Sequence, residues 1–117
     1  MAVCPKDEIY EYLCSVQAKL MLNVANLMII DRKDRKNQNC MVELGLRHMD
    51  VAGILQSLTV RNYSETVEDE KFPGTVLRVF GYSYEGHELY IKLALRKKVV
   101  CVSIHEKEYD MIYPYAD

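Results

Sequence analysis

The sequence predicts an α+β fold in which helices pack on one face of an antiparallel sheet. Helical spacing of apolar residues is confined to the first half of the chain, strand-like alternation dominates residues 75–105, and short turns join the alternating segments. Helices that precede a run of hairpin-linked strands are typical of an antiparallel sheet covered on one side. The opposite side, here called the outer face, is then open to solvent.

Three helices are expected before residue 59. The first covers 5–22, because Pro5 suits the first helical position and apolar residues recur along one stripe, at Ile9, Leu13, Val16 and Leu20. The second follows the charged run 31–37 and ends before Gly45, which suits a left-handed C-cap. The third runs from about residue 48 to 58, with one apolar side.

Four strands are expected, at 27–30, 75–84, 88–95 and 99–105. The first is a short β-branched run that suits an edge strand, and turns are expected at 85–86 and 96–98. The segment 59–71 has no sustained apolar period and is expected to be a loop. The tail from residue 106 is expected to be irregular, with its tyrosines packed back on the sheet.

Length and composition are those of one globular domain, expected to span residues 1–117, since half of the residues are apolar and 27% are charged. No signal peptide is visible, and the longest uncharged segment, 20–30, is too short to cross a membrane. A cytoplasmic protein without a membrane partner is therefore expected. The net charge is −2, but residues 76–105 carry five basic and two acidic side chains.

Cysteine and histidine spacing argues against a metal site. The cysteines, at positions 4, 14, 40 and 101, form no CxxC pair, and the three histidines are scattered. Reduced, partly buried thiols are therefore expected, and no metal or other cofactor. The sequence also contains no Gly-rich phosphate loop, no paired-carboxylate motif and no spacing typical of a serine nucleophile.

Alternation in the last two strands gathers polar side chains on the outer face. If Leu89, Ile91, Leu93 and Leu95 pack on the helices, then Tyr90, Lys92 and Arg96 point outward. In the same register Leu77, Val79, Val100, Val102 and Ile104 face inward, whereas the outer face receives Arg78, Phe80, Val99, Cys101, Ser103 and His105. A slip of one residue in any strand would reverse its set.

This set of outward side chains suits an anionic polymer such as single-stranded RNA. Lysine and arginine neutralise phosphates, and aromatic rings stack on bases. RNA cleavage without a metal needs a base, an acid and a cation. His105 is the best proton-transfer candidate, because histidine ordinarily titrates near neutral pH. Lys92, with Arg78 or Arg96, could stabilise the charged phosphorane, and Tyr90 could orient the phosphate or donate a proton. A solvated surface with an ordinary surface histidine is the alternative interpretation.

Short motifs add a family resemblance. Leu44-Gly-Leu46 with Asp50, Leu58-Thr59 and Tyr63, followed by Leu89-Tyr-Ile-Lys-Leu93 and Val102-Ser-Ile-His105, resemble the MqsR-type (motility quorum-sensing regulator) toxins over residues 28–105. The resemblance implies a RelE-like α+β fold, metal-independent cleavage of messenger RNA as the toxin of a type II toxin–antitoxin system, and a cognate antitoxin that silences it.

Carried over position by position, the resemblance implies catalytic roles for Tyr90 and His105, with a third residue near Arg78. The family's lysine after the third helix is missing, because Ser64 stands there, and Arg61 or Lys92 could supply the charge. The RNA-binding set expected around these residues is Arg61, Tyr63, Phe80 and Arg96. Two other functions stay open: a non-catalytic RNA- or protein-binding module of the same fold, and an unrelated small α+β protein.

Overall fold

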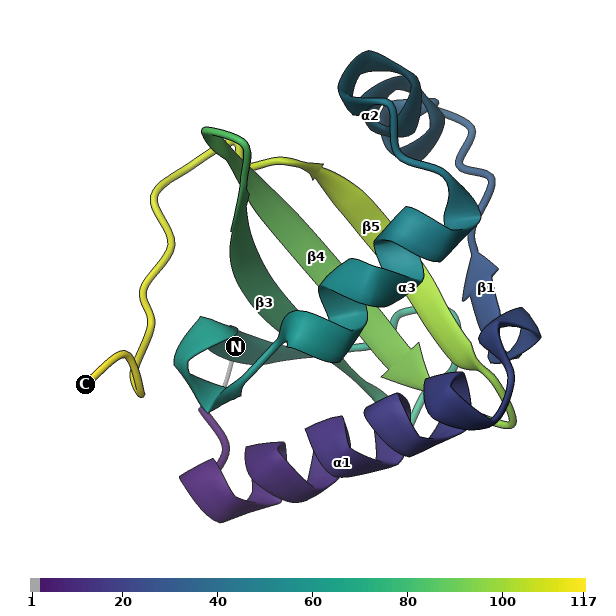
Figure 1. Ribbon diagram of the computed structural model, residues 1–117. Coiled ribbons are helices and arrows are strands. Elements are labelled where there is room, and N and C mark those ends of the chain that lie inside the picture. The colour runs from purple at the N-terminus through teal and green to yellow at the C-terminus, as the bar shows by residue number, and fades with distance from the viewer. Residues whose placement is uncertain (1–2) are drawn as a thin grey trace.

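The computed structural model describes residues 3–117 as three α-helices packed against one five-stranded sheet (Figure 1). The elements are α1 (Lys6–Leu22), η1 (Val24–Asn26), β1 (Leu27–Ile29), α2 (Lys36–Leu44), α3 (His48–Ser57), η2 (Val60–Asn62), β2 (Tyr63–Glu68), β3 (Val76–Tyr84), β4 (His87–Leu95) and β5 (Val99–Glu106). The α+β fold predicted from the sequence is confirmed, as are its three helices.

The sheet has the order β1-β5-β4-β3-β2, so β1 and β2 are its edges. Antiparallel pairing joins β2 to β3, β3 to β4 and β4 to β5. The expected edge strand is present as β1, but it pairs in parallel with β5, so the sheet is mixed rather than wholly antiparallel. This pairing brings the charged segment that follows β1 beside the end of β5.

Helix ends follow the capping signals in the sequence. Gly45, after α2, has φ of 66°, and its N–H donates to the carbonyl of Val42, while the N–H of Leu46 donates to that of Met41. Glycine adopts this left-handed conformation without steric cost, which ends the helix sharply. At the start of α3 the backbone N–H of Arg47 donates to the Asp50 carboxylate over 2.8 Å.

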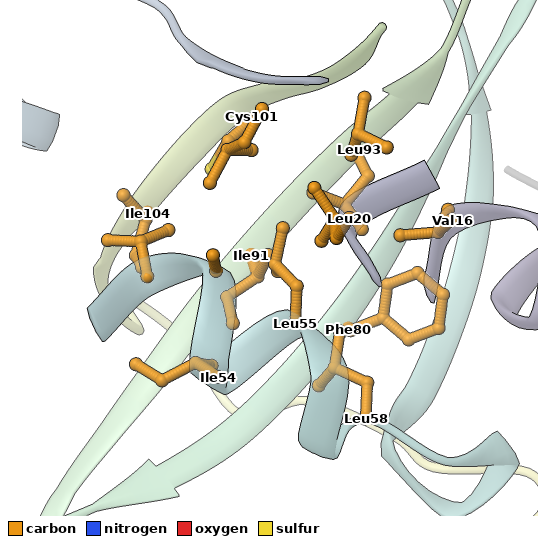
Figure 2. Packing of buried hydrophobic residues seen from close by; sticks show 14 of the residues in the cluster. Val16, Leu20, Ile54, Leu55, Leu58, Phe80, Ile91, Leu93, Cys101 and Ile104 are labelled. Atoms are coloured by element: carbon orange, nitrogen blue, oxygen red, sulfur yellow. The ribbon is translucent and has the colours of Figure 1, made fainter. Parts of the chain in front are cut away.

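The main core lies between the helices and one face of the sheet. In Figure 1 α3 lies across that face and α1 runs along its lower margin. Figure 2 shows Val16 and Leu20 of α1 with Ile54 and Leu55 of α3 against Phe80, Ile91, Leu93, Cys101 and Ile104 of the strands. Fully burying each such side chain contributes about 1.5–3 kcal/mol. This core fixes the sheet and leaves its outer face for other contacts.

Most of the segment 59–71, expected to be a loop, has regular secondary structure, and residues 69–71 lie in a loop. It contains η2 and the edge strand β2, which pairs along β3 from Tyr63 to Glu68. The register shifts between Tyr63 and Glu65, so Ser64 is an extra residue in the strand. Such a bulge interrupts the two-residue alternation by which a strand is recognised in a sequence, and the prediction was therefore wrong.

The register predicted for β3 is also wrong. Arg78 lies opposite Leu93 and Phe80 lies opposite Ile91, so both residues face the helices, whereas Leu77 and Val79 face outward. The outer face carries an apolar cluster of its own, formed by Leu77, Ala94 and Val100 and partly covered by Ile30, Val67 and Val102. A strand buried on both sides offers two apolar sets, and its pattern does not say which set meets the helices.

A second bulge changes the faces of β5 midway. Lys92 lies opposite Ser103 and Leu93 opposite Cys101, so Val102 is the extra residue. Before the bulge Val99 and Cys101 point into the core and Val100 points outward, the reverse of the prediction. Val102, also expected inward, packs on the outer cluster. After the bulge the prediction is right: Ile104 points inward, and Ser103 and His105 point outward.

Asn37 of α2 secures the bulge from the neighbouring helix. Its side chain has no solvent exposure (0%). Its Nδ2 donates to the carbonyls of Ile30 and Val102, over 3.1 Å each, and its Oδ1 accepts from the N–H of Ile104 over 2.8 Å. The amide therefore satisfies backbone groups around the bulge and joins α2, β5 and the end of β1 in one place.

The tail 107–117, yellow in Figure 1, runs from the end of β5 back along the molecule. Its backbone accepts a hydrogen bond at Ile112 from Ser64 Oγ over 2.7 Å, and Tyr115 stacks on Tyr63 with ring centroids 6.0 Å apart. A Cβ at Gly81 would lie 2.7 and 2.8 Å from two carbons of the Tyr113 ring. The absent side chain at Gly81 therefore makes room for the tail, whose tyrosines pack on the sheet as expected.

Within residues 3–117 no helix combines the length and the apolar character that crossing a bilayer requires.

Candidate active site

A cavity of about 160 Å³ opens on the outer face above β4 and β5. Its walls come from four parts of the chain: the β1–α2 connection, the start of α2, the two strands, and the first residues of the tail. The lining residues are Arg32, Lys36, Tyr90, Lys92, Ser103, His105, Glu108 and Tyr109. The strand register brings three of the predicted residues together here, namely Tyr90, Lys92 and His105.

Tyr90 and His105 form a stacked pair at one wall of the cavity. They lie opposite each other on β4 and β5, with ring centroids 5.2 Å apart and planes 14° from parallel. His105 Nδ1 is 2.9 Å from the carbonyl oxygen of Glu106. A carbonyl can only accept, so in this arrangement Nδ1 carries a proton and Nε2 is the atom that can accept or release one.

Burial shifts the pKa values of Tyr90 and Lys92, the two side chains that β4 contributes to the cavity. Partial burial, and then the nearby charge of Arg32, lowers the pKa of Lys92 below its ordinary value. This lysine therefore releases its proton more readily than a solvated one. Burial, and then the hydroxyl of Tyr109, raises the pKa of Tyr90 above that of a free phenol. The Tyr90 hydroxyl therefore stays protonated at neutral pH and acts as a hydrogen-bond donor.

Two further cations enter the cavity from the charged segment after β1. Arg32 donates from Nη1 to Ser103 Oγ over 2.8 Å, and its Nη2 pairs with Asp34 at 2.6 Å. Lys36, the first residue of α2, donates to both carboxylate oxygens of Glu108, over 2.8 and 3.0 Å. The hydrogen bond from Lys36 holds the pKa of Glu108 below its usual range.

The sequence interpretation missed Arg32, Lys36, Glu108 and Tyr109. The signal for the first two was the charged run 31–37, whose position beside β5 depends on the parallel pairing of β1. That pairing joins segments about 70 residues apart, as the contact between Arg32 and Ser103 shows with a separation of 71 residues. No local pattern in the sequence predicts such a pairing.

With Lys92 protonated, the lining carries three cations and one carboxylate, a net charge of +2 before His105 is counted. A cavity of this sign attracts anions, and its half-buried walls strengthen the attraction relative to open water. The cavity also holds the His105 imidazole, whose Nε2 can accept or release a proton, and a phenol that donates. The arrangement can therefore bind an anionic group such as a phosphate and move protons beside it.

Arg78 and Phe80 do not reach this cavity, and their predicted outward placement is wrong. Arg78 Nη1 donates to Thr66 Oγ1 over 2.8 Å and to Cys4 Sγ over 2.6 Å, on the helix side of the sheet. Its guanidinium lies 5.3 Å from the ring centroid of Tyr12. Phe80 has no solvent exposure (0%) and packs in the main core.

The remaining predicted RNA-binding residues also lie outside the cavity. Tyr63 has no solvent exposure (0%), and its hydroxyl is 2.7 Å from Thr66 Oγ1, so its ring cannot offer a surface for a base. Arg96 pairs with Asp69 at 2.8 Å and lies 4.4 Å from the ring centroid of Phe72. Arg61 is exposed on η2, and the cavity lining does not include it.

The described cysteines are all free, as expected. Burial raises the pKa of Cys40 to about 11 and that of Cys101 to about 12, so both thiols stay protonated at neutral pH. Residues 3–117 contain no group of three or more His, Cys, Asp or Glu side chains placed to bind a metal ion.

Comparison with known proteins gives one match. A model of the family described as "Motility quorum-sensing regulator, toxin of MqsA" matches residues 16–106, which is 91 of the 117 residues. No curated protein and no solved structure matches the chain. The matched span contains every cavity residue except Glu108 and Tyr109. The chain thus belongs to the motility quorum-sensing regulator toxin family, and it is the toxin of a toxin–antitoxin system whose partner is a cognate antitoxin.

Proposed function

We propose that this toxin is an endoribonuclease that cleaves single-stranded messenger RNA without a metal ion, and that the cavity between β4, β5 and the start of α2 is its active site. The observation that carries the proposal is the meeting of the stacked Tyr90–His105 pair with three cations in one cavity. RNA cleavage by its own 2′-hydroxyl needs these components: a proton acceptor, a proton donor and positive charge at the phosphate.

The geometry supports a division of roles. His105 Nε2 takes the proton from the ribose 2′-hydroxyl, whose oxygen then attacks the phosphorus. Lys92 and Arg32 stabilise the charge that collects on the phosphorane, and the lowered pKa of Lys92 suits it to protonate the departing 5′-oxygen. Tyr90 orients a phosphate oxygen through its hydroxyl. The products are a 2′,3′-cyclic phosphate and a 5′-hydroxyl end.

In the proposed active site, Arg32 and Lys36 supply the positive charge that the family's missing lysine would have supplied. Ser64 stands at that position, and its Oγ donates to the carbonyl of Ile112, so it serves to hold the tail. Arg32 already points into the cavity through its contact with Ser103. Lys36 becomes available to a phosphate when Glu108 yields its ion pair.

The test is cleavage of an all-ribose single-stranded RNA by the purified protein in the presence of a chelator. We expect fragments that end in 2′,3′-cyclic phosphate and begin with 5′-hydroxyl. His105→Ala should lower the rate by about 10²–10⁴-fold, because it removes the proton acceptor. His87→Ala is the matched control, since His87 also lies on the sheet but pairs with Glu106 outside the cavity.

Expression in cells provides the second arm of the test. The wild-type chain should arrest growth and deplete messenger RNA, and the cognate antitoxin should relieve both effects. If wild type and His105→Ala both leave RNA intact, the nuclease proposal is wrong. RNA binding without cleavage would instead favour the non-catalytic binding module.

A further inference from the structure

We propose that a second groove, next to the active-site cavity, holds a nucleobase beside the scissile phosphate, and that the Glu65 carboxylate recognises an amino group on that base. This inference rests on the proposed ribonuclease function. It goes further by assigning a base-recognition residue that lies outside the catalytic cavity.

The groove lies between β2 and the tail and has a volume of about 480 Å³. This volume falls within the range of about 300–1,000 Å³ that is typical of small-ligand pockets. Val3, Met111, Ile112 and Pro114 give it mainly apolar walls. Tyr109 lines both the groove and the active-site cavity, so the two spaces are neighbours.

The strand register places Glu65 in line with the catalytic lysine. Glu65 lies opposite Val79, Val79 opposite Lys92, and Lys92 opposite Ser103, so the four residues form one row across the outer face. Two strand spacings, about 9.5 Å, separate the backbones of Glu65 and Lys92. A nucleotide whose phosphate contacts Lys92 can therefore direct its base across Tyr109 towards Glu65.

One oxygen of the Glu65 carboxylate lacks a hydrogen-bond partner within residues 3–117. Its Oε1 is buried and has no hydrogen bond among the residues that the structure describes. A buried polar atom without a partner costs free energy, and such atoms are rare in folded proteins. Glu65 as a whole is only partly buried and lines the groove, so a hydrogen-bond donor placed in the groove meets this carboxylate.

The chemistry of a carboxylate selects the kind of base. An ionised carboxylate only accepts hydrogen bonds, so its partner must present N–H groups. Adenine, guanine and cytosine carry an exocyclic amino group, whereas uracil presents a single ring N–H between two carbonyl oxygens. The apolar walls and the half-exposed ring of Tyr109, 55% exposed, suit the flat face of a base. The groove should therefore favour an amino-bearing base over uracil.

The experiment measures the affinity for short RNAs that carry a 2′-deoxy nucleotide at the scissile ribose and cannot be cleaved. At the positions flanking that ribose, guanine is compared with hypoxanthine and adenine with purine, because each pair differs by one amino group. At one position, loss of the amino group should weaken wild-type binding about tenfold, as expected for a hydrogen bond to a charged group.

Three variants assign this effect to Glu65. Glu65→Met removes the acceptor and should abolish the difference between the paired RNAs. Glu65→Gln keeps one accepting oxygen and should retain part of it. Glu68→Met is the matched control on the same strand, because Glu68 is exposed and does not line the groove, and it should behave as wild type.

Parallel cleavage of all-ribose RNA separates the two proposals. If RNA is cleaved but the paired bases bind equally, or if Glu65→Met keeps the difference, the groove proposal alone is overturned. If the protein neither binds nor cleaves RNA, both proposals fail. If Glu65→Met weakens binding of the antitoxin and leaves the base preference unchanged, the groove holds a side chain of the antitoxin. The base-recognition proposal is then overturned.

Discussion

Single side chains in the cavity act through their positions in the strand register. Tyr90 lies opposite His105 and Lys92 lies opposite Ser103, so neighbouring pairs of β4 and β5 supply the stacked rings and the central cation. Alternation alone was enough to predict that Tyr90 and Lys92 share the outer face. Arg32 and Lys36 lie outside the strands, and their charges make the net charge of the cavity positive.

Lys92 should make the stability of the protein depend on alkaline pH. Its pKa is lower in the folded state than the ordinary 10.5, because burial and Arg32 disfavour the charged form. The unfolded chain therefore binds this proton more tightly, and stability rises with pH between the folded pKa and 10.5. Lys92→Met removes the cost of the buried charge and should be more stable than wild type at pH 7.

Urea unfolding of wild type and Lys92→Met across neutral and alkaline pH tests this expectation. The advantage of the variant should shrink as the pH rises from the folded pKa of Lys92 towards 10.5, and it should level off above 10.5, where Lys92 is neutral in both states. Lys97→Met, at an exposed turn position, should show no such convergence. A difference between Lys92→Met and wild type that stays constant with pH would show that the gain comes from apolar packing.

At the scale of elements, the bulge in β5 and the amide of Asn37 depend on each other. Asn37→Ala would leave two partly buried carbonyls and one buried N–H without their Asn37 partner. Each such group costs about 1–3 kcal/mol, and because the two carbonyls are only partly buried we expect the low end, a loss of about 3 kcal/mol in the free energy of unfolding, measured in urea. Asn39→Ala, on the exposed side of the same helix, should change stability by less than about 0.5 kcal/mol.

Activity provides a second measurement on the same variant. The Asn37 side chain bonds to Val102 and Ile104, which flank Ser103 and precede His105. Asn37→Ala should therefore lower RNA cleavage under conditions where the variant is still fully folded. Full activity in the folded variant would show that the strand holds its register without the helix.

The elements also show which structural features can be predicted from the sequence. Helices α1, α2 and α3 follow from apolar periodicity and from Gly45, which are local signals. The strand β2 and the faces of β5 could not be derived, because one extra residue in each, Ser64 and Val102, interrupts the alternation. The face of β3 was missed for a different reason: both of its sides are buried.

At the scale of the whole molecule, positive and negative side chains are unevenly distributed. The net charge is only −2, yet the cavity lining is positive, and Arg96 is paired with Asp69 of the acidic segment after β2. The sequence indicated a basic sheet, because residues 76–105 carry five basic and two acidic side chains. It could not show that the acidic segment neutralises one of the basic residues while Arg32 and Lys36 supply the charge of the cavity, since both arrangements depend on contacts between distant segments.

RNA binding should therefore weaken with salt in proportion to the few cations that meet phosphates. Removing one such cation lowers the slope of log affinity against log salt by about 0.7 for a single strand. We expect Lys36→Met to reduce the slope by about this amount with uncleavable RNA. Lys98→Met, at an exposed turn away from the cavity, should leave the slope unchanged.

The extra residue Val102 has a consequence for how this strand can evolve. Substitutions along β5 change one side chain at a time, but deletion of a residue other than Val102, with the bulge kept, would invert every side chain beyond the deletion. A deletion before the bulge would take Val99 out of the core, and one between the bulge and His105 would turn His105 away from Tyr90. Loss of Val102 itself would leave Cys101 opposite Leu93 and Ser103 opposite Lys92, with the faces unchanged. We therefore expect β5 to tolerate many amino-acid replacements and few changes of length other than the loss of its extra residue.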